Sequence, residues 1–332
     1  MSRTARVTGA LLLLVVIVLI FAGWRLYDHS MRGQGPRSLG EQLIEALDQN
    51  SLPKANQLLD QGADMAAKEP YTGRTCLMAA ATRSDEAIIR RMIQRGADIN
   101  AMDVSRSTPL YYLLATGHPT LTLVKLLLPK ADLMRHNFGS GTLALERAVE
   151  IRNPQIVRVL LDGGANAGGK GMAGKPLLIA AVEADDLATV RELVSHGASV
   201  NVPGQQGERA LQTTLGLGDD AMAQYLIAHG ADINVADADG NTPLLLAAAN
   251  NLSGTLTALL AKGAKVNARN KKGETALIVA VRDGRGEMVD ALLKAHADTT
   301  PRDKTTRSAL AWAKDQDFAG IAQALKKHGA GR

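Results

Sequence analysis

The segment with the strongest chemical signature is a glycine-rich run between two predicted helices. Gly169, Gly171 and Gly174 satisfy the spacing G-x-G-x-x-G. Lys175 follows directly and completes a second pattern, G-x-x-x-x-G-K. Either pattern binds phosphate only between a buried strand and a helix, because backbone N–H groups must point at the anion. Here a helix end precedes the run, and Pro176 stands where a P-loop carries its metal-binding hydroxyl. The sequence therefore favours a flexible connecting loop over a phosphate site.

Histidines and paired acids are the next candidates for chemistry. His196, His229 and His328 each stand one residue before a Gly-Ala pair that ends a predicted helix. A histidine there interacts favourably with the carbonyl end of the helix, and three separate helix ends do not converge on one metal. The pairs Asp185-Asp186 and Asp219-Asp220 fall in turns before predicted helices, where Asp is a common N-cap. We expect capping roles, no metal site and no cofactor.

The sequence gives no sign of an activated nucleophile. Cys76 is the only cysteine, which excludes an intrachain disulfide and a cysteine metal cluster. It stands at a predicted helix start, where a small core residue is the favoured interpretation. Aromatic residues make up only 3% of the 332 residues, too few for most compact enzymes of this size. We therefore predict that the protein is not an enzyme and has no small-molecule substrate.

A repeat organises the chain behind these residues. A Gly-Ala pair, or a close variant, returns every 33 or 34 residues and ends a predicted helix each time. These pairs begin at Gly62, Gly96, Lys130, Gly164, Gly197, Gly230, Gly263, His296 and Gly329. A helix start keeps the same period, most clearly as Thr108-Pro109-Leu110 and Thr242-Pro243-Leu244. Each unit reads as helix, turn, helix and a short extended finger.

This double pattern resembles the ankyrin repeat family over roughly 39–330. The resemblance implies an all-α solenoid of about nine helix-turn-helix units with short β-hairpin fingers, the first and last units serving as caps. The first unit is expected to hold helices at Leu39–Leu47 and about Lys54–Gln61. The family usually has His after Thr-Pro-Leu, where it bonds the turn. This chain has Met78, Tyr111, Leu245 and other residues there, so its turns must be bonded differently.

Charge is distributed unevenly along the chain. The net charge is +5, with +3 in residues 1–32, −5 in residues 33–261 and +7 in residues 262–332. The chain has no basic stripe with interleaved aromatic residues, so we expect no nucleic-acid partner.

The N-terminus carries a strongly apolar segment. Residues 1–6 are a short basic tail, and 7–27 are predicted to form a transmembrane signal-anchor helix. Its first eighteen residues would span about 27 Å as a helix. Residues 28–38 form a polar linker. A cleaved secretory signal is the alternative, but Ile20 occupies a position where cleavage requires a small residue. We expect a cytoplasmic tail and repeats on the outer side of the inner membrane, which is the periplasm if the source is a Gram-negative bacterium.

The ankyrin resemblance implies that a partner binds the concave face, at finger tips and the ends of first helices. The candidate partner-binding residues carried over by register are Tyr71, Arg74, Arg83, Val104, Phe138, Met172, Gln206, Asp239, Asn241, Lys271, Lys272 and Arg282. Tyr71 and Phe138 are large groups at positions expected to be exposed, which makes them candidate anchors.

The predicted function is a membrane-tethered, non-catalytic scaffold that binds a protein partner in the cell envelope. A second hypothesis is an inhibitor or immunity protein that occludes an envelope-acting toxin or enzyme. An adjacent secreted effector gene would favour this second hypothesis. An enzyme is the third and least favoured hypothesis, because no site assembles.

Overall fold

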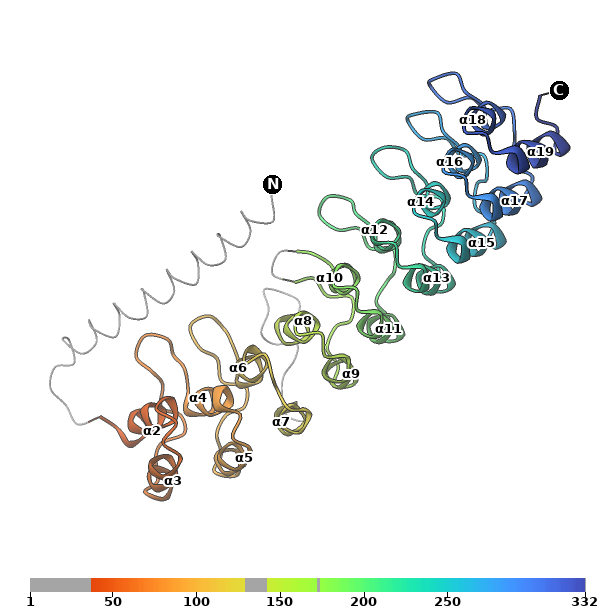
Figure 1. Ribbon diagram of the computed structural model, residues 1–332. Coiled ribbons are helices and arrows are strands. Elements are labelled where there is room, and N and C mark those ends of the chain that lie inside the picture. Colours follow the sequence, from red (N-terminus) through yellow and green to blue (C-terminus); the bar gives the residue numbers. More distant parts are fainter. Residues whose placement is uncertain (1–36, 129–141, 172–173, 332) are drawn as a thin grey trace.

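The computed structural model describes residues 37–128, 142–171 and 174–331. In these residues the chain forms eighteen α-helices in nine consecutive pairs (Figure 1). The first helices of the pairs are α2 (Leu39–Asp48), α4 (Cys76–Arg83), α6 (Pro109–Ala115), α8 (Thr142–Glu150), α10 (Leu177–Glu183), α12 (Ala210–Leu217), α14 (Pro243–Ala249), α16 (Ala276–Arg282) and α18 (Ala309–Asp315). The second helices are α3 (Leu52–Asp60), α5 (Glu86–Gln94), α7 (Leu121–Leu127), α9 (Pro154–Asp162), α11 (Leu187–Ser195), α13 (Asp220–Ala228), α15 (Ser253–Ala261), α17 (Gly286–Lys294) and α19 (Ala319–Lys327).

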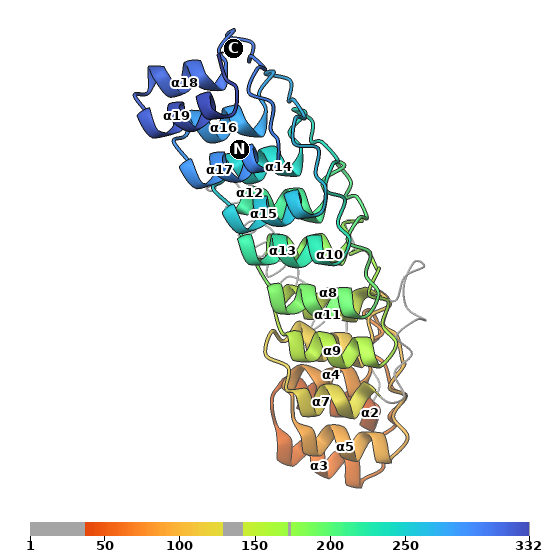
Figure 2. The ribbon, with the colours of Figure 1, turned by 90° about the vertical axis from the view of Figure 1, so that its right-hand side faces the viewer.

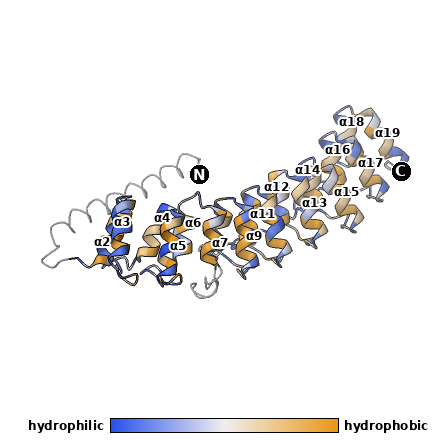
Figure 3. Cartoon of the chain, turned by 90° about the horizontal axis from the view of Figure 1, so that it is seen from below, coloured by the Kyte–Doolittle hydropathy of each residue, from blue (hydrophilic) through white to orange (hydrophobic). Residues whose placement is uncertain are grey.

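The pairs stack side by side into an elongated solenoid. First helices form one row and second helices form another, with α2 and α3 at one end and α18 and α19 at the other (Figure 1). The segments that join one pair to the next project together along one edge (Figure 2). We call these segments fingers and name each by the helix that follows it. Apolar residues run along the helices, and hydrophilic residues gather in the turns (Figure 3).

Hydroxyl side chains start most first helices. The side chains of Thr75, Thr242 and Thr275 each accept a hydrogen bond from the backbone N–H three residues later, as an N-cap does. Pro109 and Pro243 occupy the first helical position, where the missing N–H is no loss. These local contacts fix where each repeat begins.

The Gly-Ala pairs end the second helices as predicted. The glycines adopt positive φ, for example +82° at Gly62 and at Gly263, and His296 takes the same conformation at +60°. The following alanine donates its backbone N–H to a carbonyl five residues earlier, as in Ala264 to Leu259 at 3.0 Å. This left-handed cap turns the chain sharply into the next finger.

Leucine and alanine form one continuous core. The leucines that follow the helix starts are almost fully buried, including Leu77, Leu110 and Leu244. Burial of each leucine side chain stabilises the fold by about 1.5–3 kcal/mol. Small residues between them, such as Ala79 and Ala248, let neighbouring first helices approach closely. Because one pair alone has no second layer to cover it, stability comes from stacking.

Asparagine side chains also tie adjacent repeats together. The side-chain oxygen of Asn201 accepts the backbone N–H of Asp232 at 2.9 Å. Asn234 accepts from Lys265 at 2.9 Å, and the same bond recurs from Asn267 in the next repeat. Each bond joins one finger to the next, so the fingers keep a fixed register along the edge.

Some expectations need correction or fall outside the described residues. The fingers were expected to be β-hairpins, but in the described fingers pairing is limited to single bridges, as between Lys68 and Thr75. The second helix of the first unit begins at Leu52, two residues before the predicted start, because Pro53 fits the first helical turn. The predicted tail, transmembrane segment and most of the linker, as well as Phe138 and Met172, lie outside the described residues.

Candidate functional site: the finger face

The candidate site is a row of adjacent finger tips together with the C-terminal ends of the first helices. We call this surface the finger face. Backbone hydrogen bonds connect neighbouring tips, from Val104 N–H to the Thr72 carbonyl at 2.8 Å and from Lys271 N–H to the Asp239 carbonyl at 2.9 Å. A third bond of this kind links Lys304 to the Lys272 carbonyl at 2.9 Å. These bonds join the tips of the α4 and α6 fingers, and separately those of the α14, α16 and α18 fingers, into two ordered stretches of the edge.

An Asp or Asn side chain holds each of four fingers in shape. The residues are Asp103, Asp237, Asn270 and Asp303, one in each of the α6, α14, α16 and α18 fingers. Each accepts the backbone N–H four residues later through one side-chain oxygen, at 2.7–3.1 Å. Because the side chain captures this donor, a regular strand ladder does not form in these fingers. This bonding explains how the turns close without the histidine that is usual in the family.

Two aromatic donors reinforce this arrangement. The Tyr112 hydroxyl donates to Asp103 at 2.8 Å, and the Trp312 indole N–H donates to Asp303 at 2.8 Å. Burial and the bond to Asp103 raise the pKa of Tyr112 above its ordinary value, so it remains a donor. Burial opposes ionisation of Asp303, but bonds from Thr305 and Trp312 outweigh it and lower the pKa. The Asp303 carboxylate is thus held in the charged form.

Glycine allows the tips to approach each other. Gly73 and Gly240 have φ of +68° and +81°, a conformation that other residues adopt only with strain. A Cβ atom on Gly240 would lie 3.1 Å from the backbone nitrogen of Lys271. At Gly73 it would lie 3.3 Å from that of Val104. In both cases the crowded backbone nitrogen is the one that donates the hydrogen bond between the two fingers.

Among the described residues of the finger face, large apolar side chains are exposed at three points. Tyr71 is 56% exposed and Val104 is 71% exposed, on the adjoining α4 and α6 fingers. Leu217, at the end of α12, is 54% exposed. Leu217 was not among the predicted site residues. It occupies the same position in its repeat as the predicted Arg83, and this shared position was the signal that could have identified it. Leu39, on α2, is 36% exposed and is the other exposed large apolar residue in the described part of the chain.

The predicted arginines brace neighbouring units. Arg74 forms ion pairs with Asp48 and with Glu69, the latter at 2.9 Å. Arg83 donates to the backbone carbonyls of Leu47 and Asp48 at the end of α2, the Leu47 bond measuring 3.0 Å. These contacts connect α2 to α4 and its finger. Both side chains have a structural role that their register did not indicate.

A second network occupies two predicted residues near the C-terminus. Arg282 pairs with Glu274 and with Asp283, the latter at 3.1 Å. Asn241 accepts a hydrogen bond from Asn270 at 2.9 Å, and Asn270 also donates to Glu274 at 2.8 Å. The network joins the α14 and α16 fingers. By contrast, the side chains of Gln206, Asp239, Lys271 and Lys272 are exposed at their tips.

The glycine-rich run does not form a phosphate cradle. Its described N–H groups are directed inward, from Gly169 to the Asn166 carbonyl at 3.1 Å and from Gly171 to the Lys175 carbonyl at 2.9 Å. The Lys175 ammonium pairs with Glu183 at 2.6 Å. In the described part of the run, the N–H groups of Gly169 and Gly171 are therefore used within the chain's own loop.

The other chemical candidates also have structural roles. His196, His229 and His328 each place Nδ1 2.8–3.0 Å from the carbonyl four residues earlier, which confirms helix-end capping. Cys76 is fully buried, and burial raises its pKa to about 12. Asp186 caps α11 through Thr189 N–H at 3.0 Å. Within residues 37–128, 142–171 and 174–331, no three His, Cys, Asp or Glu side chains gather as a metal site would require.

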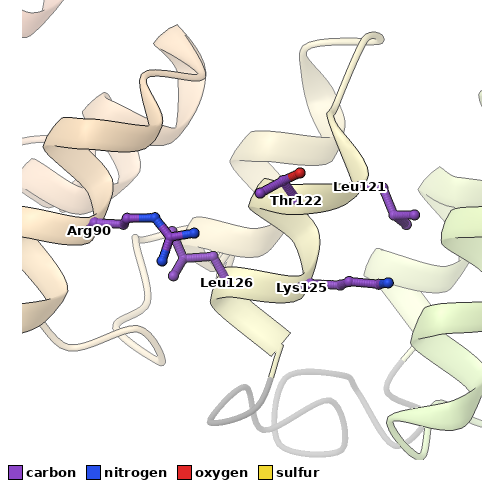
Figure 4. A pocket seen from close by; sticks show the side chains of 5 residues that line it. All are labelled: Arg90, Leu121, Thr122, Lys125 and Leu126. Carbon is purple, nitrogen blue, oxygen red and sulfur yellow. The ribbon is translucent and has the colours of Figure 1, made fainter.

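A shallow groove lies beside α5 and α7, in the row of second helices. Arg90, Leu121, Thr122, Lys125 and Leu126 line a volume of about 370 Å³ (Figure 4). Arg90 approaches from α5, and the other four side chains extend from α7. The lining contains no carboxylate, histidine or thiol, so it provides no acid–base pair for a reaction. The groove adds no catalytic chemistry to the finger face.

The described helices are all short. None of those in 37–128, 142–171 and 174–331 has the length and apolar character needed to cross a bilayer.

Sequence comparison groups the chain with proteins built on the same repeat. The family described as "Ankyrin repeats (3 copies)" matches residues 43–137, 114–204, 177–270 and 246–331. Together these overlapping matches cover almost the whole helical stack.

Individual relatives share part of the chain. A "Mitochondrial disaggregase" of Bos taurus is 34% identical over 137 residues, 40% of this chain and 20% of that protein. "Ankyrin repeat and SOCS box protein 6" of Homo sapiens is 30% identical over 118 residues, 34% of this chain and 28% of that protein. "Tyrosine-protein kinase Shark" of Drosophila melanogaster is 27% identical over 136 residues, 41% of this chain and 14% of that protein. The chain therefore spans less than a third of the length of these three relatives.

Proposed function

The chain belongs to the ankyrin repeat family, and from that premise we propose that it is a non-catalytic scaffold that binds a protein partner on its finger face. The partner is a folded protein or a segment of one, and the scaffold supplies contact area and orientation. Repeat scaffolds bind unrelated targets on one architecture, so the partner's identity follows from the exposed residues and not from the fold.

One observation carries this proposal. Tyr71 and Val104 expose apolar surface on adjoining tips that a backbone hydrogen bond holds together. Large side chains held on ordered backbone lose little freedom on binding, which is the property of interface anchors. Leu217 extends the apolar contacts of the finger face toward its centre. A catalytic site would require ionisable side chains that converge on one point. The carboxylates of Asp103 and Asp303 instead accept hydrogen bonds that close the turns of their own fingers.

We further propose that residues 7–27 tether the scaffold to the inner membrane with its repeats in the periplasm. The support is the apolar run between Ala10 and Ala22 and the short basic tail before it. The linker of eleven residues, 28–38, would let the first unit lie at most about 35–40 Å from the bilayer. Partners would then be proteins of the cell envelope. An alkaline phosphatase fusion after residue 332 tests the orientation, and activity confined to the cytoplasm would reverse it.

The binding proposal is tested by crosslinking and capture with the full chain. We expect Tyr71→Ala with Val104→Ser to weaken capture of the partner at least tenfold, because interface anchors each contribute more than about 1 kcal/mol. Leu39→Ala is the matched control, since it removes an exposed apolar side chain from α2, outside the finger face. Undiminished capture by the double variant would reject these anchors. Equal loss in both variants would indicate nonspecific apolar binding.

A further inference from the structure

The last two fingers combine exposed cations with hidden acids. Lys271 and Lys272 are exposed on the α16 finger, and Lys304 is exposed on the α18 finger. We call these three residues the basic tips. The acidic residues nearest to them in sequence are buried, Glu274 at 9% and Asp303 at 8% exposure, whereas Asp298 near the start of the α18 finger is exposed. The surface charge of this region is therefore more positive than its composition alone indicates.

The buried acids bond to groups of their own fingers and of the helices that follow. Asp303 accepts hydrogen bonds from Thr305 N–H at 2.8 Å, Arg307 N–H at 3.1 Å and the Trp312 indole at 2.8 Å. Glu274 accepts from Asn270 and pairs with Arg282. In residues 174–331, none of the basic tips forms an ion pair with a carboxylate. Their ammonium groups face solvent with no internal counter-charge.

The basic tips form part of an ordered row that changes sign at one end. The Lys304 N–H bonds to the Lys272 carbonyl, which places the two cationic fingers next to each other. On the other side, the Lys271 N–H bonds to the carbonyl of Asp239, whose side chain is exposed on the α14 finger. A ligand lying along the row thus meets positive charge on two fingers and then negative charge on the third.

This arrangement selects among anionic partners. A polyanion of uniform charge would be repelled where it reaches Asp239. Anionic membranes are usually joined by an apolar or aromatic group that enters the interface, and these fingers expose no large apolar side chain in the described residues. Trp312 lies under Arg307, 4.6 Å from its guanidinium, and donates to Asp303, so it is not free to stack on a base. A protein segment can vary its charge along its length and match the row.

We propose that the basic tips bind an acidic segment of a protein partner, with a cationic residue of that segment opposite Asp239. The inference rests on the proposed protein-binding function and adds a partner chemistry to it. Such exposed contacts mainly steer association and set specificity, and they weaken as salt screens them. This docking surface lies at the far end of the stack from Tyr71 and Val104 (Figure 1).

The test uses the full chain in detergent and a fluorescent peptide of eight glutamates followed by two arginines. In the variant Lys271→Gln, Lys272→Gln, Lys304→Gln we expect affinity to fall about tenfold at low salt. The matched control is Lys294→Gln, Lys326→Gln, Lys327→Gln, which removes the same charge from exposed positions on α17 and α19. We expect the control to change affinity by less than about twofold.

Further measurements identify the ligand class and separate the two proposals. Asp239→Lys is expected to weaken binding of this peptide and to strengthen binding of a plain glutamate decamer. Tighter binding to a single-stranded DNA decamer than to either peptide would overturn the inference. A preference of the reconstituted chain for phosphatidylglycerol over phosphatidylcholine vesicles that the tip variant loses would also overturn it. Equal loss in the tip variant and its control, or no loss in either, would also overturn it. If the acidic peptide does not bind while capture of the partner still depends on Tyr71 and Val104, the inference about the basic tips is rejected and the proposed function is retained.

Discussion

Replacing Asp303 tests whether one buried carboxylate holds a finger in place. One oxygen accepts the N–H groups of Thr305 and Arg307, and the other accepts the Trp312 indole N–H. Asp303→Asn keeps an oxygen for the two backbone donors but presents an NH₂ group to the indole. One charge-assisted bond is lost and a part-buried donor is left without a partner, so we expect a loss of about 1.5 kcal/mol. Asp303→Ala removes every acceptor, and we expect about 3 kcal/mol.

Hydrogen exchange by mass spectrometry measures this loss in the full chain. A solenoid opens locally from its ends, so the amides of α18 and α19 report on the last unit. Since about 1.4 kcal/mol corresponds to a factor of ten, exchange there should speed about tenfold in Asp303→Asn and about a hundredfold in Asp303→Ala. Exchange in α4 should be unchanged in both variants. Rates within twofold of the parent in Asp303→Ala would refute the assigned role.

Two further measurements identify the Trp312 bond itself. Trp312→Phe removes the donor, so Asp303→Asn should cost less in that background than in the parent chain. The pKa of Asp303 is lowered in the folded state, so its charge stabilises the fold above the unfolded value of 3.8 and this contribution is lost as pH falls through the folded value. The difference between parent and Asp303→Asn should therefore shrink below about pH 4. Strictly additive costs in the double variant would show that the two side chains do not interact.

Three more predictions follow from local contacts. Gly240→Ala should destabilise the α14 finger by about 1–2 kcal/mol, seen as faster exchange at Lys271, because φ is positive and the new methyl would crowd that nitrogen. The bond to Asp162 raises the pKa of His196, so this pair should add a few tenths of a kcal/mol below the unfolded pKa of 6.5 and lose it as pH rises through the folded value. Urea unfolding midpoints of Asp162→Asn and the parent, measured at pH 5.5 and at pH 8.5, check this. A midpoint difference between variant and parent that is the same at both pH values would contradict it. Cys76 should resist alkylation at pH 8 until the chain unfolds, and rapid labelling of the native protein would refute its burial.

The repeat could be predicted from sequence because its signals are local. A Thr followed by Pro and Leu caps and starts a helix within four residues, and a Gly-Ala pair ends one within two. His196 and its equivalents bond to a carbonyl only four residues away, so their role was also predictable. The same local chemistry accounts for Cys76, which stands at a helix start next to the buried Leu77.

The shape of the fingers was harder to predict because two local tendencies compete. The repeat resemblance implies hairpins, but Asp303 and its equivalents offer acceptors to the same backbone N–H groups that a hairpin would use. The sequence contains the signal, an Asp or Asn five residues before the last residue of the finger. The bond forms where the side chain is buried, as in Asp303, and also where it is half-buried, as in Asp103 and Asp237.

The candidate site was predicted by register, and register does not reveal side-chain partners. Arg83 reaches carbonyls 35 and 36 residues away, and Arg74 reaches Asp48 across 26 residues. Those partners belong to the preceding repeat, and contact depends on side-chain rotamers that only stacking selects. Lys271 has no such partner and remains exposed, although it occupies an equivalent surface. Position in the repeat therefore identifies the edge but not which of its residues are available.

The bonding within the fingers has a consequence for recognition. Side-chain oxygens close the turns of four fingers by accepting backbone N–H groups, from Asp103, Asp237, Asn270 and Asp303. The side chains at the tips can therefore differ without altering the backbone that carries them. The chain uses this freedom to place apolar tips at one end and basic tips at the other. Seven helix-to-helix steps separate the α4 and α18 fingers, on the order of 60 Å.

That separation constrains any partner that uses both ends. One small domain cannot contact both patches, so simultaneous binding requires an elongated partner or two connected segments. If the two contacts are joined by a flexible linker, each raises the effective concentration of the other, and affinity exceeds that of either patch. Loss of the apolar tips and loss of the basic tips should then each weaken capture. The effect of losing the basic tips should disappear at high salt, whereas the effect of losing the apolar tips should persist.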